Sequence, residues 1–267
     1  MKLISKGDDY GFTRGVTLGI VDSIKLGHLR NTGLFANSRW AEYAVGFMKD
    51  CPEACFGIDI NLVAGRPCAD PRDIPDLVDE NGFLIRSTER VRDPRWQTVE
   101  GKNALMTYHD AYIETQAQIK KFIEMVGRKP GYVGGHSLSS PDSARAMADA
   151  ARDLGCVLVS DLQEKYNIKR IPTSAYSKAS KEKVFDPADQ LAKDPLGFVL
   201  SHPENIEGIE YGIIGGHPGY IDDELVSGGL TTLSLERMKD AAMWMSPELD
   251  AWLKENNIEV IRFDDLY

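Results

Sequence analysis

The stretch LISKGDDYGFTRG, residues Leu3–Gly15, sets the pattern for the rest of the chain. An apolar opening leads through Gly7 into two adjacent carboxylates, Asp8 and Asp9, and then to Gly11. A simple turn after a strand needs only one acidic residue and a glycine. The second carboxylate therefore indicates a role beyond the turn, and Gly11 is expected to let the backbone leave the site for the first helix.

The segments that follow repeat a short apolar run and then a helical pattern. Because such units place their strands in parallel, the sequence predicts an α/β fold, a distorted (β/α) barrel of mainly parallel strands with outer helices. Strands are expected at Leu3–Lys6, Asn31–Asn37, Ala54–Leu62, Gly131–His136, Cys156–Ser160, Gly197–His202, Tyr211–His217 and Ile258–Phe263. Helices are expected at Val16–Leu26, Ala41–Met48, Asn103–Val126, Pro141–Leu154, Leu235–Met245 and Pro247–Glu255. Irregular segments are expected at Gly65–Gly101 and Lys165–Pro195, and with no linker or internal repeat we expect a single catalytic domain, 1–267.

Composition narrows the possible functions. The 267-residue chain has a formal net charge of −10 and no block of basic residues, which argues against a nucleic-acid-binding surface. No window approaches the roughly 20 apolar residues of a membrane span. The N-terminal residues MKLISKGDDYG lack the apolar segment of a secretory signal, so a cytoplasmic protein is expected. Its four cysteines are expected to be reduced thiols.

Polar side chains recur at the carboxyl ends of separate expected strands. In an α/β barrel these ends converge on one face, where active sites form. A pattern set by stability alone does not predict this repetition. The residues concerned are Asp8, Asp9, Asn37, Asp59, Asn61, His136 and His217.

These residue types are suited to hydrolysis. Carboxylate and imidazole groups form a common metal set, in which three protein ligands leave a position open for water or substrate. Because successive side chains of an extended segment alternate in direction, Asp8 and Asp9 are expected to point different ways. One could bind a metal while the other accepts a proton from water, and His217 could protonate a leaving group.

Each residue also has a structural interpretation when it is taken alone. Asp8, His136 and His217 are each typical of a turn or surface loop. A lone carboxylate such as Asp59, in an apolar strand, is costly to bury without a partner. Aromatic residues near the strand ends could stack on a sugar or belong to the core, and these are Tyr10, Phe12, Trp40, Trp96 and Tyr220. We favour a functional site because the polar residues occur together.

The motifs resemble those of a known family. The segment GDDYGFTRGVTLGI resembles the opening A-D-D-F-G-x-[ST]-x-x-[VI]-N-x-G-I of the YdjC-like carbohydrate deacetylases. Six further segments resemble later motifs of that family in the same order, namely NTGLFAN, FGIDINLVAGRP, IPDLVDENGFL, YIETQAQIKKF, KPGYVGGHSLSSP and GGHPGYID. The resemblance implies a metal-dependent deacetylase that removes acetyl from an N-acetylated sugar or oligosaccharide.

The resemblance also implies roles for individual residues. Asp9 and His136 would be metal ligands, Asp8 the catalytic base, and His217 an acid or transition-state stabiliser. The residues expected to contact the carbohydrate are Tyr10, Asn37, Asn61, Arg66 and Tyr220. A homodimer is expected by resemblance only, and neither a nucleic acid nor a membrane is expected as a partner.

Two departures from the family pattern concern the metal. The family's histidine in G-x-H-L-[NT]-L is Asp59 here, and Leu138 and Ser140 replace its later histidines, while Gly134 stands where the family has an acid. Asp59 can still act as a ligand, and a set rich in oxygen favours one Mg²⁺ or Mn²⁺ ion, with Zn²⁺ possible. The same departures leave two alternatives open: a degenerate member that binds sugar without turnover, and a hydrolase of a different amide or ester.

Overall fold

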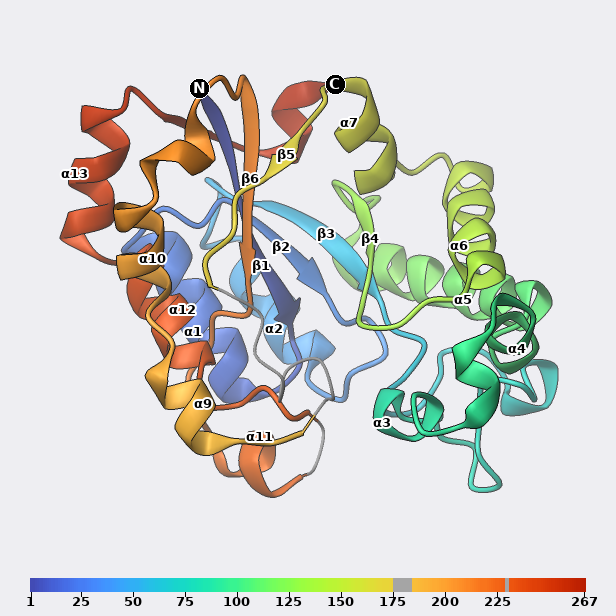
Figure 1. The fold of residues 1–267 in the computed structure, drawn as a ribbon. Coiled ribbons are helices and arrows are strands. Elements are labelled where there is room, and N and C mark those ends of the chain that lie inside the picture. The colour runs from blue at the N-terminus through green and yellow to red at the C-terminus, as the bar shows by residue number, and fades with distance from the viewer. Residues whose placement is uncertain (175–183, 229–230) are drawn as a thin grey trace.

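The computed structural model describes residues 1–174, 184–228 and 231–267. Its strands form one sheet in the order β4-β3-β2-β1-β6-β5, and β7 pairs with β1 beside β2. The strands are β1 (Lys2–Tyr10), β2 (Asn31–Leu34), β3 (Cys55–Ile60), β4 (Val133–Gly135), β5 (Lys169–Arg170), β6 (Tyr211–Gly216) and β7 (Glu259–Ile261). Every pairing between them is parallel. The sheet curls into a half-barrel with helices around it (Figure 1), which confirms the predicted fold class.

Helices cover the outside of the curled sheet. In Figure 1, α1, α10, α12 and α13 lie on one side, and α5 and α6 lie on the other. The helices are α1 (Arg14–Lys25), α2 (Ala41–Met48), α3 (Ser87–Arg90), α4 (Val99–Leu105), α5 (Tyr108–Val126), α6 (Pro141–Asp153), α7 (Val159–Lys165), α9 (Pro187–Ala192), α10 (Pro195–Ser201), α11 (Asp223–Ser227), α12 (Arg237–Trp244) and α13 (Pro247–Glu255). In the part of the chain that the structure describes, none of these helices has the length and apolar character of a membrane span.

The central strand β1 is irregular where its two acids lie. Its register with β2 shifts between Gly7 and Tyr10, and Asp9 has a φ of 72°, in the left-handed region that most residues avoid. Gly11 follows with a φ of 81°, at which a side chain would be strained. The chain thus turns from β1 towards α1 at Gly11, as the sequence predicts.

Helix α1 begins at a capped turn and packs closely on a later segment. The side chain of Thr13 accepts a hydrogen bond from the backbone N–H of Val16. A Cβ at Gly19 would lie 2.5 Å from the backbone nitrogen of Tyr220, so only glycine permits this approach. The loop after β6 is therefore held against α1, next to the carboxyl end of β1.

Some predicted elements are wrong. The segment Gly197–His202 lies in helix α10 and not in a strand, because Asp194 caps the helix by accepting the backbone N–H of Gly197 and Pro195 fits its first turn. In Cys156–Ser160 only Leu158 forms a bridge, to Val133, before α7 begins. The extended segment is too short to form the predicted strand, because helix α7 begins at Val159.

The long helix Asn103–Val126 and the predicted irregular segments also differ from expectation. The helix divides into α4 and α5 because the backbone of Thr107 is extended, and the carbonyl of Met106 accepts a hydrogen bond from the Ser140 hydroxyl. The segment Gly65–Gly101 contains α3 and the start of α4, and Lys165–Pro195 contains β5 and α9. Residues 175–183 of the second segment lie outside the described residues.

Candidate active site

Asp9 lies at the centre of a buried charge cluster. Its side chain is fully buried, with Oδ2 2.5 Å from Nη2 of Arg237 and Oδ1 3.1 Å from Nδ1 of His136. Burial by itself would raise the pKa of Asp9, but the charges of Arg237 and His136 hold it well below its ordinary value. Asp9 is therefore ionised at neutral pH. It is held by Arg237, on helix α12, and by His136, which follows β4.

Lys6 lies between the other two acids of the site, Asp8 and Asp59, and contacts both. Its ammonium forms an ion pair with Asp8 and lies 3.1 Å from Oδ1 of Asp59. Burial opposes the charge on Lys6, but the carboxylates of Asp59 and Asp8 together raise its pKa above the ordinary value. Burial raises the pKa of Asp59 to about 6, with Lys6 opposing this rise. At neutral pH, Lys6 and Asp59 therefore form a charged pair.

His217 faces Asp8 from the neighbouring strand. Its Nε2 lies 3.9 Å from Oδ2 of Asp8, and its backbone N–H donates a hydrogen bond of 2.7 Å to Oδ2 of Asp240. The side chains of Asp8 and His217 are each about one third exposed. Solvent can therefore reach both groups.

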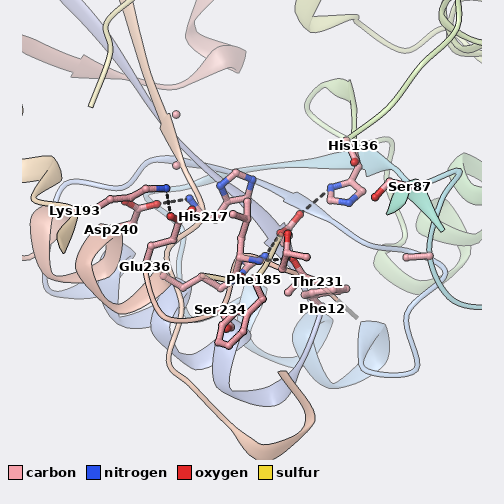
Figure 2. Close-up of a pocket in the computed structure, with 18 of the residues that line it drawn as sticks. Phe12, Ser87, His136, Phe185, Lys193, His217, Thr231, Ser234, Glu236 and Asp240 are labelled. Carbon is pink, nitrogen blue, oxygen red and sulfur yellow. Dashed lines mark hydrogen bonds and ion pairs between the residues drawn. The ribbon is translucent and has the colours of Figure 1, made fainter. Parts of the chain in front are cut away.

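A cavity of about 800 Å³ opens beside these residues. Figure 2 shows His217 between Asp240 and Lys193 on one side and His136 on the other. The lining carries several hydroxyl groups, which suit a polyhydroxylated ligand; those labelled in Figure 2 are Ser87, Thr231 and Ser234. Asp9, Phe12 and Arg237 also line the cavity, whereas Lys6, Asp8 and Asp59 are not among its lining residues. The predicted acids and histidines thus meet at the carboxyl ends of β1, β3, β4 and β6.

The three predicted metal ligands do not face one point. Asp9 Oδ1 is buried, lacks a hydrogen-bond partner and lies beside His136, so these two groups would fit a shared ion. The oxygens of Asp59 instead accept hydrogen bonds from Lys6 and from the backbone N–H of Asp9. Among residues 1–174, 184–228 and 231–267, no group of three or more histidine, cysteine or carboxylate side chains is placed to hold a metal ion. The three-ligand set does not fit this arrangement, and a bound metal stays a prediction.

The side chains of three predicted substrate contacts lie outside the cavity lining and have other partners. Tyr10 is fully buried, and its hydroxyl donates to the carbonyl of Ala44. Tyr220 lies outside the cavity lining, and its hydroxyl donates to Asp22 on α1. Arg66 lies over the ring of Phe83, 4.3 Å from its centroid. Tyr220 and Arg66 therefore lie on the outer surface, and Tyr10 lies in the core.

The predicted contacts Asn37 and Asn61 also lie outside the cavity lining, and both form hydrogen bonds within a loop. The side-chain amide of Asn61 donates to Oδ1 of Asn37 and to the carbonyl of Ala64. Asn37 donates to the carbonyls of Ala64 and Arg66. These bonds fix the loop after β3, whose residues Val63 and Ala64 do line the cavity. The two asparagines therefore affect the cavity indirectly, by holding the loop that forms part of its wall.

Among the flanking aromatic residues, the core interpretation applies to Tyr10 and Trp96. Phe12 lines the cavity and lies below the guanidinium of Arg237, 5.5 Å from its ring centroid. Trp40 donates a hydrogen bond to Glu224, and Trp96 packs against the core under Lys102. Neither tryptophan lines the cavity.

Sequence reasoning missed Lys6, Arg237 and Asp240. Lys6 interrupts the apolar run LIS just before the two acids, which is a signal that a buried partner exists. Arg237 and Asp240 are three residues apart in LERMKDAAMW, so they share one helix face. Nothing in the sequence indicates that this face meets β1.

The fold and site define a parallel α/β half-barrel with an acid–base cluster at the carboxyl ends of its strands. The chain belongs to the YdjC-like protein family, whose model matches residues 2–255. It is 29% identical to carbohydrate deacetylase 2 of Listeria innocua, with 100% of this chain and 99% of the relative covered. It is 28% identical to a carbohydrate deacetylase of Geobacillus stearothermophilus, with 99% of this chain and 97% of the relative covered.

A solved structure shares the fold. The crystal structure of a proposed cellobiose-phosphate cleavage protein from Enterococcus faecalis superposes with a TM-score of 0.77. The match covers 99% of this chain and 98% of that one, at 20% sequence identity. At this identity the similarity shows the fold alone.

Proposed function

We propose that this chain is a carbohydrate deacetylase, a hydrolase that removes acetyl from an N-acetylated sugar or oligosaccharide. The observation that carries the proposal is the full-length similarity to relatives named carbohydrate deacetylase. The hydroxyl-rich cavity supports it, because hydroxyl side chains exchange hydrogen bonds with sugar hydroxyls. The substrate is therefore a small carbohydrate, bound beside His217 and His136.

The positions of Asp8 and His217 support a division of roles. Asp8 accepts a proton as the oxygen of water adds to the acetyl carbonyl carbon. His217 then donates a proton to the leaving nitrogen as the carbon–nitrogen bond breaks, giving acetate and a free amine. The 3.9 Å between Asp8 Oδ2 and His217 Nε2 supports this division, because two groups this close can act on one bound acetamido group.

Two ion pairs fix the side chains beside the proposed acid and base, and these pairs join Asp9 to Arg237 and to His136. Arg237 neutralises Asp9, and Asp9 in turn lies against the imidazole of His136 at the cavity wall. His136 thus faces the cavity with a fixed ring. The predicted divalent metal, Mg²⁺ or Mn²⁺ before Zn²⁺, is a separate proposal that metal titration tests.

Acetate release tests the proposed function. Purified protein is incubated with N-acetylglucosamine and its oligomers, with and without added Mn²⁺, and acetate is measured. We expect Asp8→Asn and His217→Gln to lower the rate by about a hundredfold or more. His109→Ala is the matched control, because His109 is exposed and is not among the residues that line the cavity. Absence of acetate from every acetamido sugar, under both conditions, contradicts the proposal.

One observation favours a second candidate function. Lys6 occupies oxygens of both Asp8 and Asp59, so two acids of the site already have a partner. A sugar-binding protein without turnover would show saturable binding of N-acetylglucosamine oligomers and release no acetate. Calorimetric titration together with the acetate assay separates the two functions, and mass spectrometry of the products would reveal a different amide or ester substrate.

A further inference from the structure

Lys6 lies between two carboxylates. It is 9% exposed, on β1, and its ammonium contacts Asp8 on its own strand and Asp59 on β3. The ring of Tyr132 lies beside it, with the centroid 5.6 Å from Nζ. A lysine enclosed in this way has little freedom to leave its partners.

Strand β2 lies between β1 and β3 and leaves room for this contact. A Cβ at Gly33 would lie 2.2 Å from the carboxylate carbon of Asp59. The missing side chain lets Asp59 extend over β2 towards Lys6. The pair is therefore built into the sheet and does not depend on a mobile loop.

The protein supplies two side-chain cations to the three carboxylates of the cluster. Lys6 forms ion pairs with Asp8 and Asp59, and Arg237 forms an ion pair with Asp9. Buried carboxylates need a counterion, which can be a side chain or a metal. A divalent ion bound by Asp59 would lie close to the ammonium of Lys6 and would be repelled by it.

We propose that Lys6 is a built-in cation that takes the electrostatic place of a divalent metal beside Asp8 and Asp59. Asp59 is then the counterion of Lys6 and not a metal ligand. The chain binds divalent metal weakly as long as Lys6 is present, and removing the ammonium frees Asp59 to join Asp9 and His136. This inference concerns metal affinity, so it is independent of the bond that the chain hydrolyses.

Mn²⁺ binding to the full chain tests the inference. Equilibrium dialysis and the paramagnetic resonance signal of free Mn²⁺ report binding without any activity measurement. We expect weak binding by the unaltered chain and at least about tenfold tighter binding by Lys6→Met, which keeps the length of the side chain and removes its charge. The double variant Lys6→Met/Asp59→Asn should lose this gain, because the freed ligand is gone.

Two results overturn the inference. One is equal Mn²⁺ affinity in the unaltered chain and in Lys6→Met, whether that shared affinity is strong or weak. The other is tight, one-to-one binding by the unaltered chain, which needs no variant and so is informative even if Lys6→Met does not fold. Circular dichroism of each variant shows whether the fold is kept, and acetate release can fail or succeed independently of both results.

Discussion

Arg237 Nη2 lies 2.5 Å from Oδ2 of Asp9, although 228 positions separate the two residues in sequence. Both side chains are buried, with exposed fractions of 1% and 0%. The guanidinium also donates through Nε to the carbonyl of Leu233. Helix α12 is thus tied to the carboxyl end of β1, and the segments from the two ends of the chain together form one site.

Loss of this pair should destabilise the fold strongly. In Arg237→Met, Asp9 stays buried without its main counterion, and we expect a loss of about 3–5 kcal/mol in the free energy of unfolding. Arg39→Met is the control, because Arg39 is exposed and its ion pair with Glu224 lies at the surface, where such pairs contribute about 0–1 kcal/mol. Urea unfolding measures both. Equal losses in the two variants would show that the buried pair has no special role.

Asp240 should act by positioning His217. Asp240→Ala removes the acceptor of the His217 backbone N–H, so the imidazole is displaced from Asp8. We expect kcat for acetate release to fall about ten- to a hundredfold while KM changes little. Asp250→Ala is the control, since Asp250 pairs with His28 on the surface. A change confined to KM would place Asp240 in substrate binding instead.

A methyl group at Gly33 should disturb the pair of Lys6 and Asp59. In Gly33→Ala the new Cβ meets the buried carboxylate of Asp59 at 2.2 Å, and the expected destabilisation is about 1–3 kcal/mol. Gly46→Ala is the control, because a Cβ there meets nothing within 4 Å, and on helix α2 it should stabilise by about 0.5–1 kcal/mol. Thermal unfolding gives both values, and a neutral Gly33→Ala would mean that Asp59 can move aside at no cost.

Glu114 gives the stability a defined pH dependence. Burial raises the pKa of Glu114 above its ordinary value, although its oxygens accept the backbone N–H groups of Cys68 and Ala69. The folded chain therefore holds this proton to higher pH than the unfolded chain does. Stability from this group is fully present below the unfolded pKa and is lost as pH rises through the folded pKa.

The comparison with Glu114→Gln isolates this contribution. We expect the free energy of unfolding of the unaltered chain to fall, relative to that of the variant, as the pH rises above about 4.3, the ordinary pKa of glutamate. Urea unfolding across pH 4–7 measures the difference between the two chains. A difference that does not vary with pH would contradict the raised pKa.

The sequence was most informative about local order along the chain. Repeated apolar runs and helical patterns predicted the parallel strands, and α2 and α13 have the expected bounds. The segment Gly197–His202 was misread because an apolar run of this length suits either a strand or a helix. Its capping residue Asp194 and the adjacent Pro195 decide for the helix.

The candidate site was predictable in part, because the sequence shows which polar residues end the strands. Strand ends converge in any parallel half-barrel, so the pattern of Asp8, Asp9, His136 and His217 was enough to place these residues together. Aromatic and amide residues near the same ends carry no such constraint. Tyr10 entered the core and Asn61 a loop, because the direction of each side chain depends on the packing around it.

The sequence by itself determined the repeated strand–helix pattern of a parallel α/β fold and the polar residues at the strand ends. Only the tertiary structure decided which charges pair, Lys6 with Asp59 and Arg237 with Asp9. Local patterns follow from periodicity, which neighbouring residues carry. A buried charge instead takes whichever partner the folded chain brings within a few ångströms, and in this protein those partners lie on strands and helices that are distant in sequence.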